Sequence, residues 1–150
     1  MAKVYSKAID VLFEFEREIG KLNQGWPGPT LVFIAGMHGN EPSGLLALQQ
    51  VFRELSNPNF IIHGSVIGLS GNITALQSGV RFVNKDFNRV WLQEGESDHG
   101  KPPIPEPEAS EKEELLGRLR QIQAKAKGPL YFFDLHTTSS PTNPFITIND

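Results

Sequence analysis

Apolar and polar positions along the chain follow periods that predict helices and strands. Between Val4 and Leu22, apolar residues recur at three- and four-residue intervals, and most acidic residues lie between them. This period places the apolar side chains on one face, so residues 4–22 predict an amphipathic helix. Charged positions interrupt every apolar run in this segment, so we expect neither a signal peptide nor a membrane span there.

Two strand-and-helix units are predicted after this segment. The apolar run over residues 31–35 predicts a buried strand, because its length and branched side chains suit a strand covered on both faces. Residues 45–55 carry a stripe of apolar residues that predicts a helix. A second strand over residues 60–69 and a short helix reaching about Gln77 repeat the pattern.

The second half of the chain alternates in the same way. A polar, proline-containing stretch over residues 95–109 predicts an exposed loop, and residues 111–127 predict a charged helix with one leucine-rich face. The runs 130–136 and 145–148 predict a third and a fourth strand. Because strands and helices alternate, we expect one α/β domain, a three-layer sandwich with a mixed, largely parallel sheet.

Composition narrows the chemistry that this domain can perform. Fourteen basic and seventeen acidic residues give a formal charge of −3, and no basic block indicates a nucleic-acid or membrane surface, so we expect a small-molecule partner. The chain has no cysteine, which excludes disulfides, thiolate ligands and a cysteine nucleophile. This composition fits the cytoplasm, where we expect the protein to be. The oligomeric state cannot be predicted from these features.

Three candidate metal ligands lie near the ends of predicted strands. His38 follows the first buried strand, Glu41 comes three residues later at a helix start, and His136 closes the third strand. Loops at the carboxyl ends of such strands converge, so these side chains can meet. Two neutral imidazoles and one carboxylate leave a zinc ion a net positive charge and an open position for water, whose pKa then falls to about 7. The pattern predicts a hydrolytic zinc site, with Asp134 a candidate for orienting a ligand.

Each of these three residues also has an ordinary structural interpretation. His38 can be a loop histidine, Glu41 a carboxylate at a helix start, and His136 a core histidine.

Residues 81–89 add two arginines, Asn and Asp next to apolar side chains. Guanidinium groups bind carboxylates in a bidentate fork and stabilise an oxyanion beside a metal, so this segment indicates an acidic substrate. The alternative is a surface turn in which Asp86 caps a short helix and the arginines are solvated.

Three ordered motifs carry a family resemblance: GMHGNE at 36–41, DFNR at 86–89 and DLHTT at 134–138. Together they resemble the succinylglutamate desuccinylase and aspartoacylase family of zinc hydrolases, which is related to the zinc carboxypeptidases. The resemblance covers most of the chain and implies a zinc-carboxypeptidase-like fold, one Zn²⁺ per chain and hydrolysis of the amide bond of an N-acyl amino acid. Phe87 replaces the family's leucine at a position that we do not expect to contact substrate.

The resemblance also implies a role for each matching residue. The two histidines and the glutamate singled out above would be the zinc ligands. Arg81 would polarise the scissile carbonyl and stabilise the tetrahedral oxyanion. Asn88 and Arg89 would hold a carboxylate of the substrate.

One part of the family's active site is missing from this sequence. The family's general-base glutamate lies on a later segment, and we expect Glu106, Glu108 and Glu111 to Glu114 to be solvated surface carboxylates that do not replace it. A positioned base contributes about 10²–10⁴-fold to the rate, so we expect these residues alone to be nearly inactive. We therefore interpret residues 1–150 as the amino-terminal, zinc-binding part of a catalytic domain that is incomplete at its C-terminus or completed by another chain.

Two other functions are compatible with the sequence. A carboxypeptidase-like metallopeptidase would use the same metal site, and it would release C-terminal residues from peptides faster than acyl groups from amino acids. A non-catalytic metal- or carboxylate-binding module, expected if the chain naturally ends at residue 150, would bind zinc without turnover.

Overall fold

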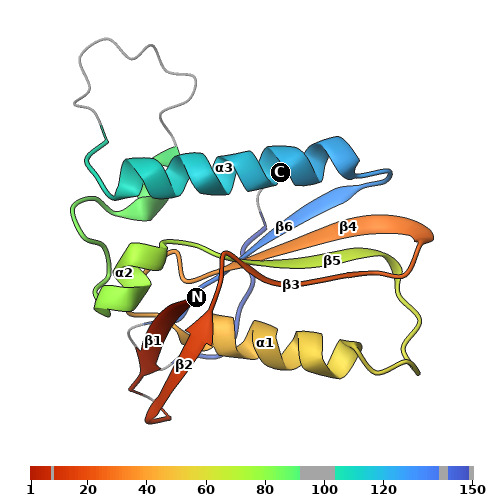
Figure 1. Cartoon of the computed structure of the whole chain (residues 1–150), viewed down its shortest axis with the longest axis horizontal. Coiled ribbons are helices and arrows are strands. Elements are labelled where there is room, and N and C mark those ends of the chain that lie inside the picture. The colour runs from red at the N-terminus through yellow and green to blue at the C-terminus, as the bar shows by residue number, and fades with distance from the viewer. Residues whose placement is uncertain (8, 92–103, 139–141, 149–150) are drawn as a thin grey trace.

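Four strands come first along the chain, and helices and strands follow them (Figure 1). The computed structural model describes residues 1–7, 9–91, 104–138 and 142–148. The strands are β1 (Ala2–Ser6), β2 (Val11–Phe15), β3 (Glu18–Asn23), β4 (Trp26–Ala35), β5 (His63–Ser70) and β6 (Leu130–Leu135). The helices are α1 (Ser43–Leu55), α2 (Ile73–Ser78) and α3 (Glu108–Lys125), with a 3₁₀ turn η1 (Phe87–Arg89).

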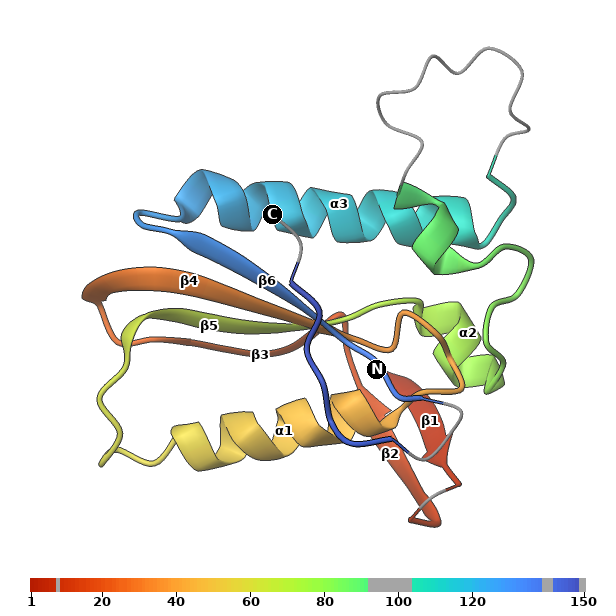
Figure 2. The same cartoon turned by 180° about the vertical axis from the view of Figure 1, so that it is seen from behind.

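Four of the strands form the central sheet, in the order β3-β5-β4-β6. Strand β4 is parallel to β5 and β6, whereas β3 is antiparallel to β5. The apolar run at the end of β4 suits its internal position, because a strand covered on both faces needs apolar side chains on both. Helices α1 and α3 lie on opposite faces of the sheet (Figure 1, Figure 2). The predicted three-layer α/β sandwich with a mixed, largely parallel sheet is therefore confirmed.

Helix α1 covers one face of the sheet through the apolar stripe that the sequence predicts. Leu45, Leu48 and Phe52 are buried, whereas Val51 at the margin of the stripe is 43% exposed. The Phe52 ring lies directly on β3, because a Cβ built at Gly20 would lie 2.4 Å from the ring. Glycine at this position of β3 therefore allows the helix to pack closely against the sheet.

Helix α3 covers the other face and begins at Glu108, three residues before the predicted start at Glu111. Leu115 is fully buried, and Leu119 and Ile122 pack against the same core cluster. The expectation that the carboxylates of this region are solvated is wrong for Glu108 and Glu111, whose exposed fractions are 0% and 7%. Both can be buried because backbone N–H groups donate hydrogen bonds to them, and a buried arginine also pairs with Glu111.

The amphipathic helix predicted for residues 4–22 is wrong. This segment forms β1, β2 and β3, and the first two strands pair as a separate antiparallel sheet. Val4 and Phe15 are both buried because the hairpin folds them onto the core that α1 covers. Between the strands, Asp10 has a left-handed φ of 54°, which does not fit a right-handed helix. Long-range strand pairing thus outweighs the local helical period.

Two further predictions concern irregular segments. Residues 145–148, predicted as a strand, join no sheet among the described residues, and Phe145, Ile146 and Ile148 are 67%, 82% and 85% exposed. An apolar run becomes a strand only where a neighbouring strand satisfies its backbone hydrogen bonds. Of the loop predicted over residues 95–109, positions 95–103 lie outside the described residues. In the described part of the chain, no helix is long and apolar enough to cross a membrane.

Candidate functional site

The candidate ligands come from the carboxyl ends of two neighbouring parallel strands. Strands β4 and β6 are in register as far as Ala35 and Leu135, so the chain leaves both strands at the same edge of the sheet. His136 follows Leu135 directly, and His38 lies in the turn between β4 and α1. The parallel register therefore brings together two histidines that are almost a hundred residues apart in the sequence.

The turn that carries His38 depends on glycine. Gly36 has a φ of 75°, in the left-handed region that favours glycine. A Cβ at Gly39 would lie 2.0 Å from the backbone carbonyl carbon of Ala75 in α2, so only glycine fits there. The N–H of Gly39 also donates a hydrogen bond of 3.1 Å to the carbonyl of Arg81. This close approach holds the arginine-containing segment beside the histidine.

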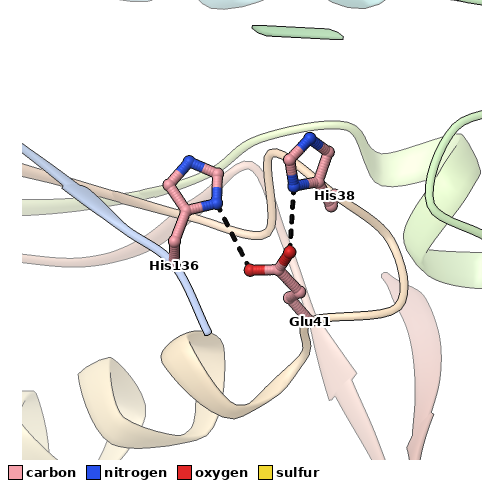
Figure 3. Close-up of side chains that lie close together, drawn as sticks. All are labelled: His38, Glu41 and His136. Carbon is pink, nitrogen blue, oxygen red and sulfur yellow. Dashed lines mark hydrogen bonds and ion pairs between the residues drawn. The ribbon is translucent and has the colours of Figure 1, made fainter. Parts of the chain in front are cut away.

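The side chains of His38, Glu41 and His136 point toward one another and form a cluster of candidate metal ligands (Figure 3). Oε1 of Glu41 lies 2.9 Å from Nδ1 of His38, and Oε2 lies 3.3 Å from Nδ1 of His136. One ligand atom from each residue can be chosen so that all three lie within 4.8 Å of one another. Tetrahedral zinc with bonds of roughly 2.0–2.1 Å separates its ligand atoms by about 3.3 Å. This donor set therefore fits a zinc ion that keeps a further position open.

Each imidazole turns Nδ1 toward Glu41 and Nε2 toward an aspartate. Oδ1 of Asp86 lies 3.1 Å from Nε2 of His38, and Oδ2 of Asp134 lies 2.7 Å from Nε2 of His136. When Nε2–H donates to the aspartate, the Nδ1 lone pair faces the cluster, where a metal would need it. These contacts support the orienting role considered for Asp134 and add a second aspartate in the same role.

The contact of Asp86 with His38 was missed in the sequence analysis. Asp86 accepts the N–H of Asn88 at 2.9 Å and caps η1, as its structural interpretation expected. The same oxygen faces His38, 48 positions earlier, and only its place in a shared set of motifs pointed to the site. Burial raises the pKa of Asp86, but hydrogen bonds with His38 and Asn88 and the charges of His38 and Arg81 outweigh burial and lower it.

The pKa of Glu41 is lowered, whereas the pKa of His136 is raised. Burial raises the pKa of Glu41, but the Thr137 N–H at 2.7 Å, the hydrogen bond with His38 and the charges of both histidines lower it below its ordinary value. The hydrogen bond with Asp134 raises the pKa of His136 above 6.5 against the effect of burial, and the charges of Asp134 and Glu41 add to the rise. Glu41 is therefore an anion at neutral pH, as a zinc ligand must be.

Arg81, Asn88 and Arg89, which we expect to contact the substrate, lie in different surroundings. The guanidinium of Arg81 is half exposed and approaches the carboxylates of the cluster glutamate at 3.8 Å and Asp86 at 3.5 Å. The amide nitrogen of Asn88 lies 3.2 Å from Nε2 of His136. Arg89 is exposed, and no ion pair links it to another described residue. The fold thus brings Arg81 to the carboxylates of the cluster and Asn88 to the Nε2 side of His136, and it leaves the Arg89 side chain exposed.

An open pocket of about 460 Å³ lies beside the cluster and is lined by Asn40, Glu41, Arg81, Thr137 and Thr138. Its size is that of a small-molecule site. The side chains of His38 and Glu41 are 3% and 8% exposed, whereas that of His136 is 31% exposed, so the cluster faces solvent on the His136 side. The pocket therefore gives a small polar molecule access to Glu41, the candidate ligand that lines it.

Residues 27–147 match the family model for the succinylglutamate desuccinylase/aspartoacylase catalytic domain. The chain belongs to this family. Among curated relatives, the succinylglutamate desuccinylase of Pseudomonas paraeruginosa is 32% identical over 111 residues, which make up 73% of this chain and 31% of the relative. That of Pseudomonas putida is 30% identical over 110 residues, with the same coverage of both chains. The chain thus spans about a third of the length of the relatives that it matches.

Solved structures of this family share the fold. The succinylglutamate desuccinylase of Vibrio cholerae superposes with a TM-score of 0.58 at 23% identity, over 72% of this chain and 30% of that one. That of Chromobacterium violaceum gives a TM-score of 0.59 at 22% identity, over 77% of this chain and 35% of that one. The expected zinc-carboxypeptidase-like fold is confirmed.

Proposed function

We propose that this chain forms the zinc-binding part of a hydrolase that cleaves the amide bond of an N-acyl amino acid. Family membership supports this proposal for the reaction class. The observation that carries it for the chemistry is the convergence of the Nδ1 atoms of His38 and His136 on the two oxygens of Glu41. This is the arrangement of two imidazoles and one carboxylate that catalytic zinc sites use.

Zinc held by His38, Glu41 and His136 would act as a Lewis acid and lower the pKa of a bound water to about 7. Glu41 would bind as an anion, because its lowered pKa keeps it deprotonated at neutral pH. Asp86 and Asp134 would hold the imidazole rings through their Nε2 atoms, which fixes the tautomer that directs each Nδ1 to the metal.

Arg81 would polarise the scissile carbonyl and stabilise the oxyanion, and its half-exposed guanidinium at the pocket supports this role. Asn88 and Arg89 would bind a carboxylate of the substrate. The curated relatives are named succinylglutamate desuccinylases, so an acidic N-acyl amino acid such as N-succinyl-L-glutamate is the first candidate substrate.

Proton transfer would need a further carboxylate at the cluster, and among the described residues the carboxylates that contact the two histidines are those of Glu41, Asp86 and Asp134. Asp86 and Asp134 already contact the histidines, and Glu108 and Glu111 are buried against other groups. We propose that the general base comes from a segment beyond these 150 residues, which agrees with the greater length of the relatives. The present chain would then bind zinc and substrate but turn over slowly.

The test uses the zinc-loaded full-length protein and measures amine release from N-succinyl-L-glutamate, from N-acetyl-L-aspartate and from a set of peptides. We expect amino acid release from the acylated substrates, lost in His136→Ala. Faster release of C-terminal residues from the peptides would identify a carboxypeptidase instead. Zinc binding without turnover of any of these compounds would identify a non-catalytic module.

A further inference from the structure

The segment that carries Arg81 and Asp86 is anchored at its two ends. Upstream, the Arg81 carbonyl accepts the N–H of Gly39. Downstream, Asp86 caps η1, whose first residue, Phe87, is fully buried. Residues 82–85 between these anchors belong to no helix or strand, and their apolar side chains are more than a third exposed. Apolar burial therefore holds the middle of this segment only in part.

Glu108 supplies the missing anchor. Its side chain is fully buried, and its Oε1 accepts the N–H groups of Val83 at 2.8 Å and Asn84 at 3.0 Å. Both amides belong to this middle stretch, where the side-chain amide of Asn84 also donates a hydrogen bond to the carbonyl of Glu106. The Glu108 carboxylate reaches them from α3, about 25 positions further along the chain. Hydrogen bonds from N–H groups to a carboxylate are stronger than those to a neutral acceptor, and burial protects them from competing water.

The helix that carries Glu108 is itself firmly held. Leu115 is fully buried in the core, and one turn after Glu108 the Glu111 carboxylate accepts hydrogen bonds from the backbone and hydroxyl of Thr74 and pairs with buried Arg17. The two carboxylates thus fasten the start of α3 to two different segments: Glu111 to α2 and Glu108 to the segment before η1. A displacement of Glu108 relative to the core would be costly.

We propose that Glu108 is a positioning residue that fixes where Arg81 lies relative to the three candidate metal ligands. The ion-pair distances of the Arg81 guanidinium, 3.5 and 3.8 Å, are long and its side chain is half exposed, so its location depends on the backbone that carries it. Asp86 depends less on Glu108, because η1 and Phe87 also hold it. This role rests on the proposed function, in which Arg81 binds the substrate.

The test compares Glu108→Ala and Glu108→Gln with Glu111→Gln, a matched variant in which the buried carboxylate next along the same helix is changed. Residue-resolved amide exchange, calorimetric titration with zinc and titration of the zinc-loaded chain with N-succinyl-L-glutamate are measured for each. In Glu108→Ala we expect exchange at Val83 and Asn84 to accelerate about tenfold, with exchange in β4 and β5 changing far less. We expect the dissociation constant for N-succinyl-L-glutamate to rise about tenfold and that for zinc to change less than about threefold.

Glu108→Gln keeps an acceptor oxygen for the two amides, so it should restore most of the substrate affinity. Unchanged exchange at Val83 and Asn84 in Glu108→Ala would overturn the proposal. So would an equal loss of substrate affinity in Glu111→Gln, because the effect would then follow from general destabilisation. If the wild-type chain does not bind N-succinyl-L-glutamate, the substrate part of the proposed function is wrong, and amide exchange, which needs no ligand, still decides whether Glu108 holds the segment.

Discussion

Replacing Asp86 with asparagine tests whether the partly buried carboxylate against His38 contributes to metal affinity. Oδ1 of Asp86 lies 3.1 Å from Nε2 of His38, and the two side chains are 22% and 3% exposed. Asparagine keeps an oxygen that can accept from both His38 and the N–H of Asn88, so η1 should stay capped while the charge is lost. The substitution therefore separates the charge of the aspartate from its geometry.

The expected loss of zinc affinity follows from the kind of hydrogen bond that the substitution changes. A hydrogen bond to a charged group contributes about 1.5–3 kcal/mol and one between neutral groups about 0.5–1.5 kcal/mol. A difference of about 1.4 kcal/mol is a tenfold change in affinity, so the zinc dissociation constant of Asp86→Asn should rise about tenfold. Competition against a chromogenic chelator measures this change, and thermal unfolding of the metal-free protein checks that the fold is kept.

Asp134→Asn is the matched control, because Asp134 makes the equivalent contact with His136. That contact is shorter, at 2.7 Å, but the two side chains are 44% and 31% exposed. Solvent screens an exposed pair, so we expect burial to outweigh distance and the zinc dissociation constant to rise only about threefold. A larger loss of affinity in Asp134→Asn than in Asp86→Asn, or no loss in Asp86→Asn, would refute this reasoning.

Three other predictions address Arg81, the glycine turn before α1 and the ion pair between Arg17 and Glu114. Arg81→Ala should weaken N-succinyl-L-glutamate binding about tenfold in calorimetric titration and leave zinc affinity almost unchanged, because the guanidinium donates to the substrate rather than to the metal. Gly39→Ala should lower the free energy of unfolding by about 1–3 kcal/mol in urea titration, because its Cβ would overlap the Ala75 backbone. The hydrogen bond with Arg17 holds the pKa of Glu114 below 4.5. The contribution of this ion pair to the free energy of unfolding is therefore present above pH 4.5 and is lost as the pH falls through the lowered pKa. Glu114→Gln should therefore be less stable than wild type at neutral pH, and the difference should vanish in acid; a difference that persists there would contradict the ion pair.

The parts of the fold that were predicted correctly are those where a local sequence pattern is compatible with only one structure. The apolar run that ends β4 can only be buried, and the stripe led by Leu45 can only face the sheet. His38 and His136 were placed together because parallel strands end at the same edge of the sheet. Motif order and the parallel topology therefore sufficed to bring the candidate ligands together.

The parts that were missed depend on partners far away in the sequence. Residues 4–22 have a helical period, but β3 pairs with β5 and Gly20 lies against Phe52, contacts that no local window contains. Glu108 and Glu111 have the sequence context of surface carboxylates, yet amides about 25 and 37 positions away turn them into buried anchors. Burial of a charged residue is decided by such partners and not by its neighbours in the sequence.

Metal analysis of the purified chain tests the zinc assignment most directly. Zinc per chain is measured after dialysis for wild type, His38→Ala and His136→Ala, and His63→Ala is the control because His63 is exposed and lies outside the cluster. We predict one zinc per chain in wild type and in His63→Ala, and loss of the metal in both cluster variants. Unchanged zinc content in His38→Ala and His136→Ala would contradict the assignment of the site.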